Sequence, residues 1–547
     1  MFSILSLRAP RWIRRFIVVP MVWLIGLLAL LFLLGFLSRN YTNLGTYYKP
    51  VGRPLKGDLD LNNPVPFTRI RLSNPSIGLT CSGGGSRAAY LTAAILSEIQ
   101  TWQEKLANGK LETNGNLLAS INAISAVSGG SLAAAYFAIN HQKLIASRAD
   151  SPPWQEYLEK MAVGYRRREW SPRALLPTVW FRMLFTNYNR GLMARDDYDD
   201  SLFHGANIND LPDQPALYLN SFDVGNHVRF VFSKHYIDTV FYQPSSWWGE
   251  LSAPQDLTAE NDLCFCRVDP SSVKIADAVY ASSAFPIAYP NLALNHFGSK
   301  ILFQGRLIFL ADGGLADNSG LVTLLTQIKA AMEAERKGGL LLVIYIDAST
   351  ERIETNGSKF QQQGIEDRYA WHDTLIGHGI QSIDSGNALV QDLVWKFLEN
   401  NGVVTDQLNL NWPMELKEKS KTNSNTSKTS WDKLFESGEL AVRPCVIRLG
   451  LRDIANPDFP KRLLDDQDPR LQRLLAANGI KQIGPYEPAP GLPEHLQRIK
   501  TDFVLSKPDR RALDLAAYLL VNGKLADDLN QWSNVVNTLV KEKGATE

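Results

Sequence analysis

Residues 77–89 read IGLTCSGGGSRAA, and this stretch decides the fold class. It opens with a short apolar run, passes through three consecutive glycines and leads into a segment in which Leu91, Ile95 and Ile99 repeat at helical spacing. Glycine permits the unusual backbone angles of a tight turn, and N–H groups at the start of a helix attract negative charge. The stretch therefore predicts a strand, a glycine loop and a helix, with the loop placed to hold a phosphate or an oxyanion.

The alternation of apolar runs and helical segments continues along the chain. Short apolar runs typical of buried strands recur at 121–127, 216–223, 228–233, 301–311, 340–347 and 441–449. Helical patterns cover 88–100, 129–140 and the segment beyond Asp509, and residues 151–200 are predicted to form a helical insertion. This alternation predicts an α/β core with a largely buried sheet.

Two more glycine-bearing turns follow apolar runs. AVSGG at 126–130 is close to the G-x-S-x-G elbow, in which a nucleophilic serine lies on a sharp turn between a strand and a helix; Ala126 replaces the first glycine. Ser128 is the candidate nucleophile, and a serine that only caps the next helix is the alternative. ADGGLADN at 311–318 places Asp312 at the end of a strand, either as a functional carboxylate or as a turn residue that bonds its own backbone.

In this order, CSGGGSRAA, SAVSGGS and ADGGLADN resemble the motifs of the patatin-like phospholipase family. ASSAFP at 281–286 and YLNSFD at 218–223 are similar to further stretches of that family. The resemblance covers roughly residues 70–350. It implies a three-layer α/β/α fold with a mostly parallel central sheet.

The resemblance also implies a serine lipid acyl hydrolase of the phospholipase or lysophospholipase type. Ser128 and Asp312 would form a catalytic dyad, and water would hydrolyse an acyl-serine intermediate. Arg87 would support the glycine loop or contact a phosphate, and neither a metal nor another cofactor would take part. The implied oxyanion donors are the amides of Gly83, Gly84 and Gly85.

Two other functions are compatible with the same residues. An α/β-hydrolase triad runs serine, aspartate, histidine along the chain, and His372 and His378 both follow Asp312. A non-catalytic membrane protein could instead keep the fold and bind lipid or a protein partner. The presence of Ser128, Asp312 and the glycine loop favours catalysis over such a binding function.

The N-terminal segment departs from the composition of a globular domain. Phe16–Leu37 is a 22-residue run without a charge, long enough as a helix to span about 33 Å and so to cross a bilayer. Four arginines lie close before the run and a single arginine lies close after it, which favours an N-terminus in the cytoplasm, whereas a wider window that includes Lys49, Arg53 and Lys56 has equal numbers of basic residues on the two sides. The sequence thus predicts a single-pass membrane anchor, with the bilayer as a partner.

These features divide the chain into four parts. We predict a basic segment and anchor at 1–40, a proline-bearing linker at 41–68, a catalytic domain at 69–350 and a mainly helical C-terminal extension at 351–547, with a disordered loop near 417–433. Lys and Arg total 57 against 56 Asp and Glu, so there is no basic excess of the kind that nucleic-acid binding requires. Four cysteines without a CxxC pair argue against a disulfide scaffold and against structural zinc. The oligomeric state is left open.

Overall fold

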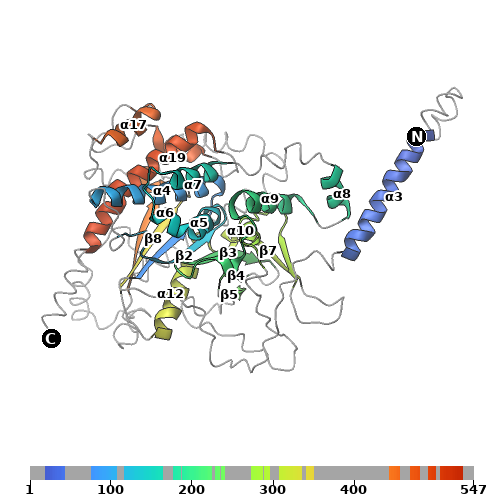
Figure 1. Cartoon of the computed structure of the whole chain (residues 1–547), viewed down its shortest axis with the longest axis horizontal. Helices are drawn as coiled ribbons and strands as arrows, with labels where there is room; N and C mark the ends of the chain where they lie inside the picture. Colours follow the sequence, from blue (N-terminus) through green and yellow to red (C-terminus); the bar gives the residue numbers. More distant parts are fainter. Residues whose placement is uncertain are drawn as a thin grey trace, which may run out of the picture.

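The computed structural model has a mixed α/β fold with a central sheet (Figure 1). The structure describes residues 19–42, 76–107, 116–163, 177–185, 188–224, 228–234, 236–240, 273–286, 289–295, 307–335, 340–349, 443–455, 468–480, 491–499 and 505–533.

In the described residues nine strands form the sheet, and a core of five parallel strands runs in the order β3-β2-β1-β8-β9. β4 and β5 extend it beyond β3, and the β6–β7 pair joins it through β7 and β3; all of these pairings are antiparallel. The strands are β1 (Ser76–Cys81), β2 (Ile121–Val127), β3 (Ala216–Asp223), β4 (Val228–Ser233), β5 (Tyr236–Val240), β6 (Leu292–Asn295), β7 (Leu307–Asp312), β8 (Leu340–Asp347) and β9 (Arg443–Gly450).

The sheet is therefore mixed, and the expectation of a mostly parallel sheet was wrong for the side beyond β3. The reason is the length of the connections. β3 and β4 are separated by four residues and β4 and β5 by two, and a connection this short can only return the chain antiparallel. The connections from β1 to β2 and from β2 to β3 are long and contain helices, as parallel pairing requires.

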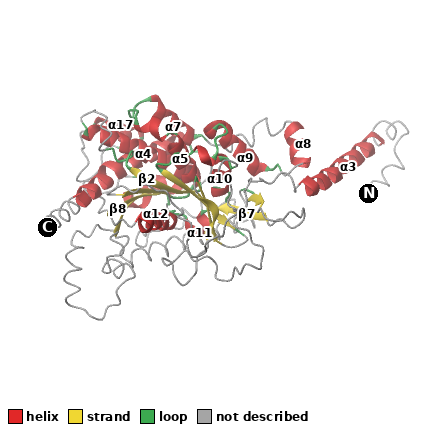
Figure 2. Ribbon diagram, turned by 60° about the horizontal axis from the view of Figure 1, so that its bottom comes forward, coloured by secondary structure: helices red, strands yellow, loops and turns green. Residues whose placement is uncertain are grey.

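Helices cover both faces of the sheet (Figure 2). On one face α5 packs against β2 and β3, and α4 packs against α5 and α7. On the other face α12 contacts β1, β2 and β3; there a side chain on Gly78 would collide with Leu324 of α12. The helices up to residue 335 are α3 (Val19–Thr42), α4 (Gly85–Leu106), α5 (Gly129–Ile139), α6 (His141–Ile145), α7 (Pro152–Ala162), α8 (Pro177–Phe185), α9 (Arg190–Tyr198), α10 (Ile275–Ser282), α11 (Gly314–Asp317) and α12 (Leu321–Glu335).

The C-terminal part of the chain joins the same core. β9 pairs with β8 along the sheet, and α19 lies across α4, its buried apolar side chains belonging to the main hydrophobic cluster (Figure 1). The helices of this part are α17 (Pro469–Ala477), α18 (Leu492–Arg498) and α19 (Lys507–Leu519), and shorter helical turns cover Leu451–Ala455 and Leu520–Leu525. The described residues of this part thus add a strand to the sheet and a helix that packs on α4.

A helix forms at the predicted anchor, and the structure describes it from Val19 to Thr42. Pro20 lies in its first turn, where the missing N–H removes no bond within the helix. Ten large apolar side chains between Met21 and Leu34 are exposed. A search of the described residues finds no helix that is both long and apolar enough to cross a membrane, so the predicted transmembrane helix is not confirmed.

Most predicted elements are present. β2, β3, β4 and β8 have the predicted bounds, and the predicted insertion contains α7, α8 and α9. Of the run 301–311, the structure describes the residues from Leu307 onward, and these belong to β7 (Leu307–Asp312). The linker beyond Thr42, the loop near 417–433 and the two candidate histidines, His372 and His378, lie outside the described residues.

Candidate active site

Ser128 lies on a strained turn between β2 and α5. Its φ of 50° and ψ of −123° fall in a region that side chains other than glycine rarely adopt, which costs on the order of 1–3 kcal/mol. The next two residues must be glycine because the glycine loop passes directly against them: a Cβ on Gly129 would lie 1.9 Å from the Gly85 carbonyl oxygen, and one on Gly130 would lie 2.6 Å from that of Ser82. The turn has the geometry of a nucleophile elbow, with the Ser128 side chain projecting from its tip.

Asp312 ends β7 and faces Ser128. The Ser128 hydroxyl donates a hydrogen bond to Asp312 Oδ2 at 2.6 Å, and both residues are buried. The Gly314 amide donates to the other carboxylate oxygen, Oδ1, at 2.8 Å. Two opposite contacts therefore fix the plane of the carboxylate and leave Oδ2 directed at the serine.

The topology explains how residues 184 positions apart meet. β2 runs along one edge of β3 as far as the pair Val127–Asn220. β7 comes from the opposite direction and, because β4 occupies the other edge, pairs with the same edge of β3, ending at the pair Ser221–Asp312. The carboxyl ends of β2 and β7 thus meet head-on at adjacent residues of β3, which places Ser128 beside Asp312.

The glycine loop opens α4 next to Ser128. Gly84 and Gly85 have φ values of +143° and +58°, which favour glycine, and their amides begin the helix, where N–H groups have no acceptor within the helix. The Gly83 amide is engaged differently, because it donates to the Asn318 carbonyl at 3.1 Å. A side chain at Gly83 would collide with that same asparagine, since its Cβ would lie 2.1 Å from Asn318 Oδ1. The three glycines therefore do not present equivalent amides.

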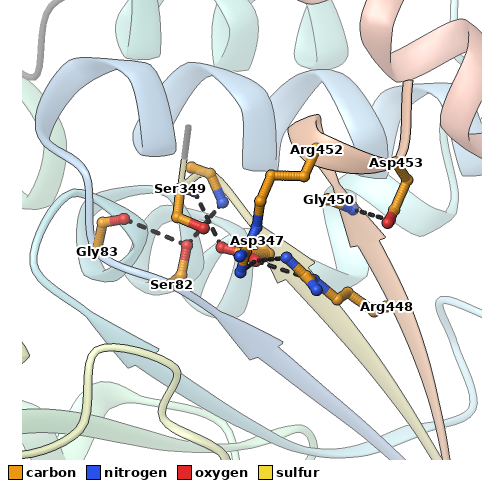
Figure 3. A network of polar contacts seen from close by, with 9 residues as sticks. Ser82, Gly83, Asp347, Ser349, Arg448, Gly450, Arg452 and Asp453 are labelled. Carbon is orange, nitrogen blue, oxygen red and sulfur yellow. Dashed lines mark hydrogen bonds and ion pairs between the residues drawn. The ribbon is translucent and has the colours of Figure 1, made fainter. Parts of the chain in front are cut away.

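A network of polar contacts connects the glycine loop to the end of β8 (Figure 3). The Ala348 amide donates to the Ser82 hydroxyl at 2.8 Å, and this hydroxyl donates to the Gly83 carbonyl at 3.2 Å. The neighbouring Asp347 carboxylate is buried and pairs with Arg448 of β9 at 2.6 Å and with Arg452 at 3.5 Å. The end of β8, the glycine loop and the C-terminal strand are therefore tied together at one point.

The neighbouring arginines set the protonation state of Asp347. Burial alone would raise the pKa of the Asp347 carboxyl, but the guanidiniums of Arg448 and Arg452 and the hydrogen bonds from Ser349 outweigh it and lower the pKa to about 2. The carboxylate is thus held in its charged form.

Arg87 follows the loop in the first turns of α4 and is buried. Its Nη1 donates to the Ile499 carbonyl at 2.8 Å, so the guanidinium links the loop helix to the segment after α18. Of the two roles that the sequence suggested for Arg87, this contact corresponds to support of the loop.

Several residues of the site carried no role in the sequence analysis. Asn220 donates through Nδ2 to the Ser125 hydroxyl and to the Ala126 carbonyl, both at 2.9 Å, and so fixes the strand that leads into Ser128. Asn220 and Asn318 both belong to stretches that carried the family resemblance, and this position was the one signal available. The pairing of Asp347 with Arg448 had no local signal, because the partners are 101 residues apart.

Among the described residues, no group of three or more His, Cys, Asp or Glu side chains is arranged to hold a metal ion. Burial raises the pKa of the Cys81 and Cys445 thiols to about 12, so neither is a reactive thiolate.

A family model of known proteins matches the part of the chain that makes these contacts. Residues 79–325 match the family model described as patatin-like phospholipase. Residues 79–325 are a patatin-like phospholipase domain. The predicted resemblance is confirmed over these residues. Ser128, Asp312 and the glycine loop all lie within the matched residues.

The similar solved structures are distant. Human GIVD cytosolic phospholipase A2 has a TM-score of 0.40 and 11% identity, covering 85% of this chain and 60% of that chain. The same human enzyme in complex with methyl gamma-linolenyl fluorophosphonate has a TM-score of 0.37 and 13% identity, with the same coverage of 85% and 60%. VipD from Legionella pneumophila has a TM-score of 0.21 and 14% identity, covering 55% of each chain. The chain spans about 60% of the length of the human enzyme, and no curated protein matches it.

Proposed function

We propose that the patatin-like domain is a serine lipid acyl hydrolase of the phospholipase or lysophospholipase type, with Ser128 as nucleophile and Asp312 as base. The observation that carries the proposal is the direct 2.6 Å hydrogen bond from Ser128 Oγ to Asp312 Oδ2. In the first step the serine oxygen attacks the ester carbonyl carbon while its proton passes to Asp312. The alcohol or lysolipid leaves with that proton, and an acyl-serine remains. Asp312 then accepts a proton from water as the water attacks the acyl-serine. This second step releases the fatty acid and restores Ser128.

The glycine loop supplies the oxyanion donors in this mechanism. We assign the role to the amides of Gly84 and Gly85, which begin α4 beside Ser128 and point from the positive end of a helix dipole. The Gly83 amide, already bound to the Asn318 carbonyl, is assigned to holding the loop instead. This revises the sequence expectation that all three glycines are donors.

The direct contact also supports a dyad over a triad. In a triad an imidazole lies between the serine and the carboxylate, whereas here the two oxygens are already at hydrogen-bond distance. A dyad predicts that replacing both His372 and His378 by alanine leaves turnover intact. Loss of turnover in that double variant, with the fold retained, would favour the esterase triad.

The test uses the full chain in detergent, with short-chain p-nitrophenyl esters and mixed phospholipid vesicles as substrates. Ser128→Ala and Asp312→Asn should each lower kcat by about 10³-fold or more. Asp277→Asn is the matched control, because Asp277 is an equally buried aspartate that pairs with Arg195 and not with Ser128. A folded wild type without turnover on any ester would sink the enzymatic proposal and leave a lipid- or partner-binding protein. Activity in Ser128→Ala would remove that residue from the mechanism.

We further propose that α3 anchors the domain to a bilayer, with the N-terminus in the cytoplasm. The proposal is supported by the uncharged run Phe16–Leu37 and by the exposed apolar side chains on several faces of α3. α8 contacts α3 and exposes Trp180 and Phe181, residue types that suit a membrane interface. An anchor would keep the active site near lipid substrate.

The anchor is tested by vesicle flotation of the full chain. Changing Leu27 and Leu28 of α3 to lysine should release the protein, since each charge costs about 2.5–3.5 kcal/mol at the centre of a membrane span. Leu106→Lys is the control, an exposed leucine at the end of α4. Equal flotation of the α3 variant and the control would contradict an anchor in α3. Protease protection of a tag before Arg8 would report the orientation.

A further inference from the structure

Ser282, the last residue of α10, lies behind the nucleophile and is completely buried. Its hydroxyl oxygen contacts three polar groups from three other elements. The Ser128 amide donates to it at 3.0 Å, the Ser131 hydroxyl lies 2.8 Å from it, and the Asn220 carbonyl accepts from it at 2.5 Å. Neither sequence motif nor family resemblance had given this serine a role.

The three contacts use the whole bonding capacity of one hydroxyl. A serine hydroxyl has one proton to donate and two lone pairs to accept with. A carbonyl oxygen can only accept, so the proton of Ser282 goes to Asn220, and the hydroxyl of Ser131 must donate to Ser282. The second lone pair receives the Ser128 amide. No other common side chain of this size can satisfy all three groups at once.

The bond to the Ser128 amide acts where the backbone is strained. A non-glycine residue at φ 50° persists only when its surroundings hold it there. The main chain of Ser282 also reaches the other half of the dyad, because its carbonyl accepts from the amide of Gly313, the residue after Asp312, at 3.2 Å. The neighbouring Ala284 carbonyl accepts the Asp312 amide at 3.0 Å. The end of α10 thus bonds the backbone on both sides of the 2.6 Å contact.

We infer that Ser282 is a positioning residue, whose hydroxyl holds the strained Ser128 backbone so that the serine oxygen stays aligned with Asp312. This inference rests on the proposed function. Ser282 does not touch the reacting atoms, and its loss should let Ser128 relax away from Asp312 without emptying the site.

The test measures how fast Ser128 in the full chain is labelled by an alkyl fluorophosphonate. In this reaction the serine oxygen bonds to phosphorus, the P–F bond breaks with loss of fluoride, and the serine proton passes to Asp312. Ser282→Ala should slow labelling and lower kcat by about 10- to 100-fold, the loss expected when a reacting group is misplaced by about 1 Å, while KM stays near the wild-type value. Ser283→Ala is the matched control, since Ser283 is also buried at the end of α10 but donates to the Val279 carbonyl of its own helix. The control should label close to the wild-type rate.

The outcomes separate the inference from the proposed function. If wild type is not labelled, or if Ser128→Ala is labelled as fast as wild type, the proposed function fails. If wild type is labelled and Ser128→Ala is not, but Ser282→Ala matches Ser283→Ala in labelling rate and kcat, the positioning role is overturned. Thermal unfolding shows whether Ser282→Ala folds. If it does not, Ser282→Cys decides, because sulfur is a weak donor and acceptor: slower labelling supports the inference and a wild-type rate contradicts it.

Discussion

At the scale of single residues, the site depends on glycines, because their lack of a side chain lets two turns approach each other closely. The glycine loop and the nucleophile turn approach so closely that backbone of one fills the space where a side chain of the other would stand. The same holds beside Asp312, where a Cβ on Gly313 would lie 2.2 Å from the Asn220 carbonyl oxygen. Because the obstacle in both cases is backbone, a rotamer change cannot relieve it.

Gly129→Ala therefore tests the packing of the two turns. The added methyl would overlap the Gly85 carbonyl, so we expect the free energy of unfolding to fall by about 1–3 kcal/mol and turnover to be lost as the loop is displaced. Chemical denaturation and ester hydrolysis measure the two effects. Gly205→Asn is the control, a positive-φ glycine with open space around its Cβ position, where asparagine is tolerated. A fully active and stable Gly129→Ala protein would contradict the close approach.

At the scale of elements, one buried ion pair joins the last two strands of the parallel core. Asp347 ends β8, Arg448 lies in β9, and the carboxylate is adjacent to the Ala348 amide that bonds the glycine loop. The pair therefore connects a strand beyond residue 440 to the loop that precedes residue 90. Breaking it should affect both the stability of the fold and the conformation of the glycine loop.

Asp347→Asn should lower the free energy of unfolding at pH 7 by about 3–5 kcal/mol, because two arginines lose their buried counter-charge. The pKa of Asp347 is lowered in the fold to about 2, so the stability it contributes is present above its ordinary pKa of 3.8 and is lost as pH falls through that window. The difference between variant and wild type should accordingly shrink towards pH 3 in urea titrations.

Asp150→Asn provides the comparison for that experiment. It removes an exposed partner of Arg148, for which a change of about 0–1 kcal/mol is expected. Equal effects of the two substitutions would show that the buried pair contributes no more than a surface pair.

At the scale of the whole molecule, the C-terminal segment is docked on the glycine-loop helix. α19 packs across α4, Tyr90 of α4 donates to Asp514 of α19 at 2.9 Å, and Arg87 reaches the Ile499 carbonyl. The described residues of 443–533 therefore share one hydrophobic core with the patatin-like domain.

Asp514 makes this docking sensitive to pH. Its burial raises the pKa from 3.8 to about 6, against the lowering effect of the Tyr90 hydrogen bond, so the fold favours the protonated acid and loses stability as pH rises from about 4 to 6. Asp514→Asn, which keeps an acceptor for Tyr90 without the charge, should raise the free energy of unfolding at pH 7.5 by roughly 1–3 kcal/mol and bring no gain at pH 4.

Asp468 has a pKa shift in the opposite direction to that of Asp514. Hydrogen bonds from Lys105, Arg470 and Tyr518 outweigh its desolvation and lower its pKa to about 2, so Asp468→Asn should destabilise at neutral pH. Thermal unfolding at the two pH values measures both variants. A stabilising Asp468→Asn, or an Asp514→Asn without effect at pH 7.5, would contradict the assigned pKa directions.

The local features of this protein follow from its sequence alone. Short apolar runs mark β2, β3 and β8 at their observed ends, and the glycine turns at 83–85, 129–130 and 313–314 mark the candidate site, because turn geometry and strand length depend on neighbouring residues. Only the tertiary structure decides that β2 and β7 meet head-on along β3, that Asn318 occupies the Gly83 amide, that Ser282 holds Ser128, and that β9 completes the sheet. These contacts join residues tens to hundreds of positions apart, and they depend on strand order, which the local pattern of side chains does not encode.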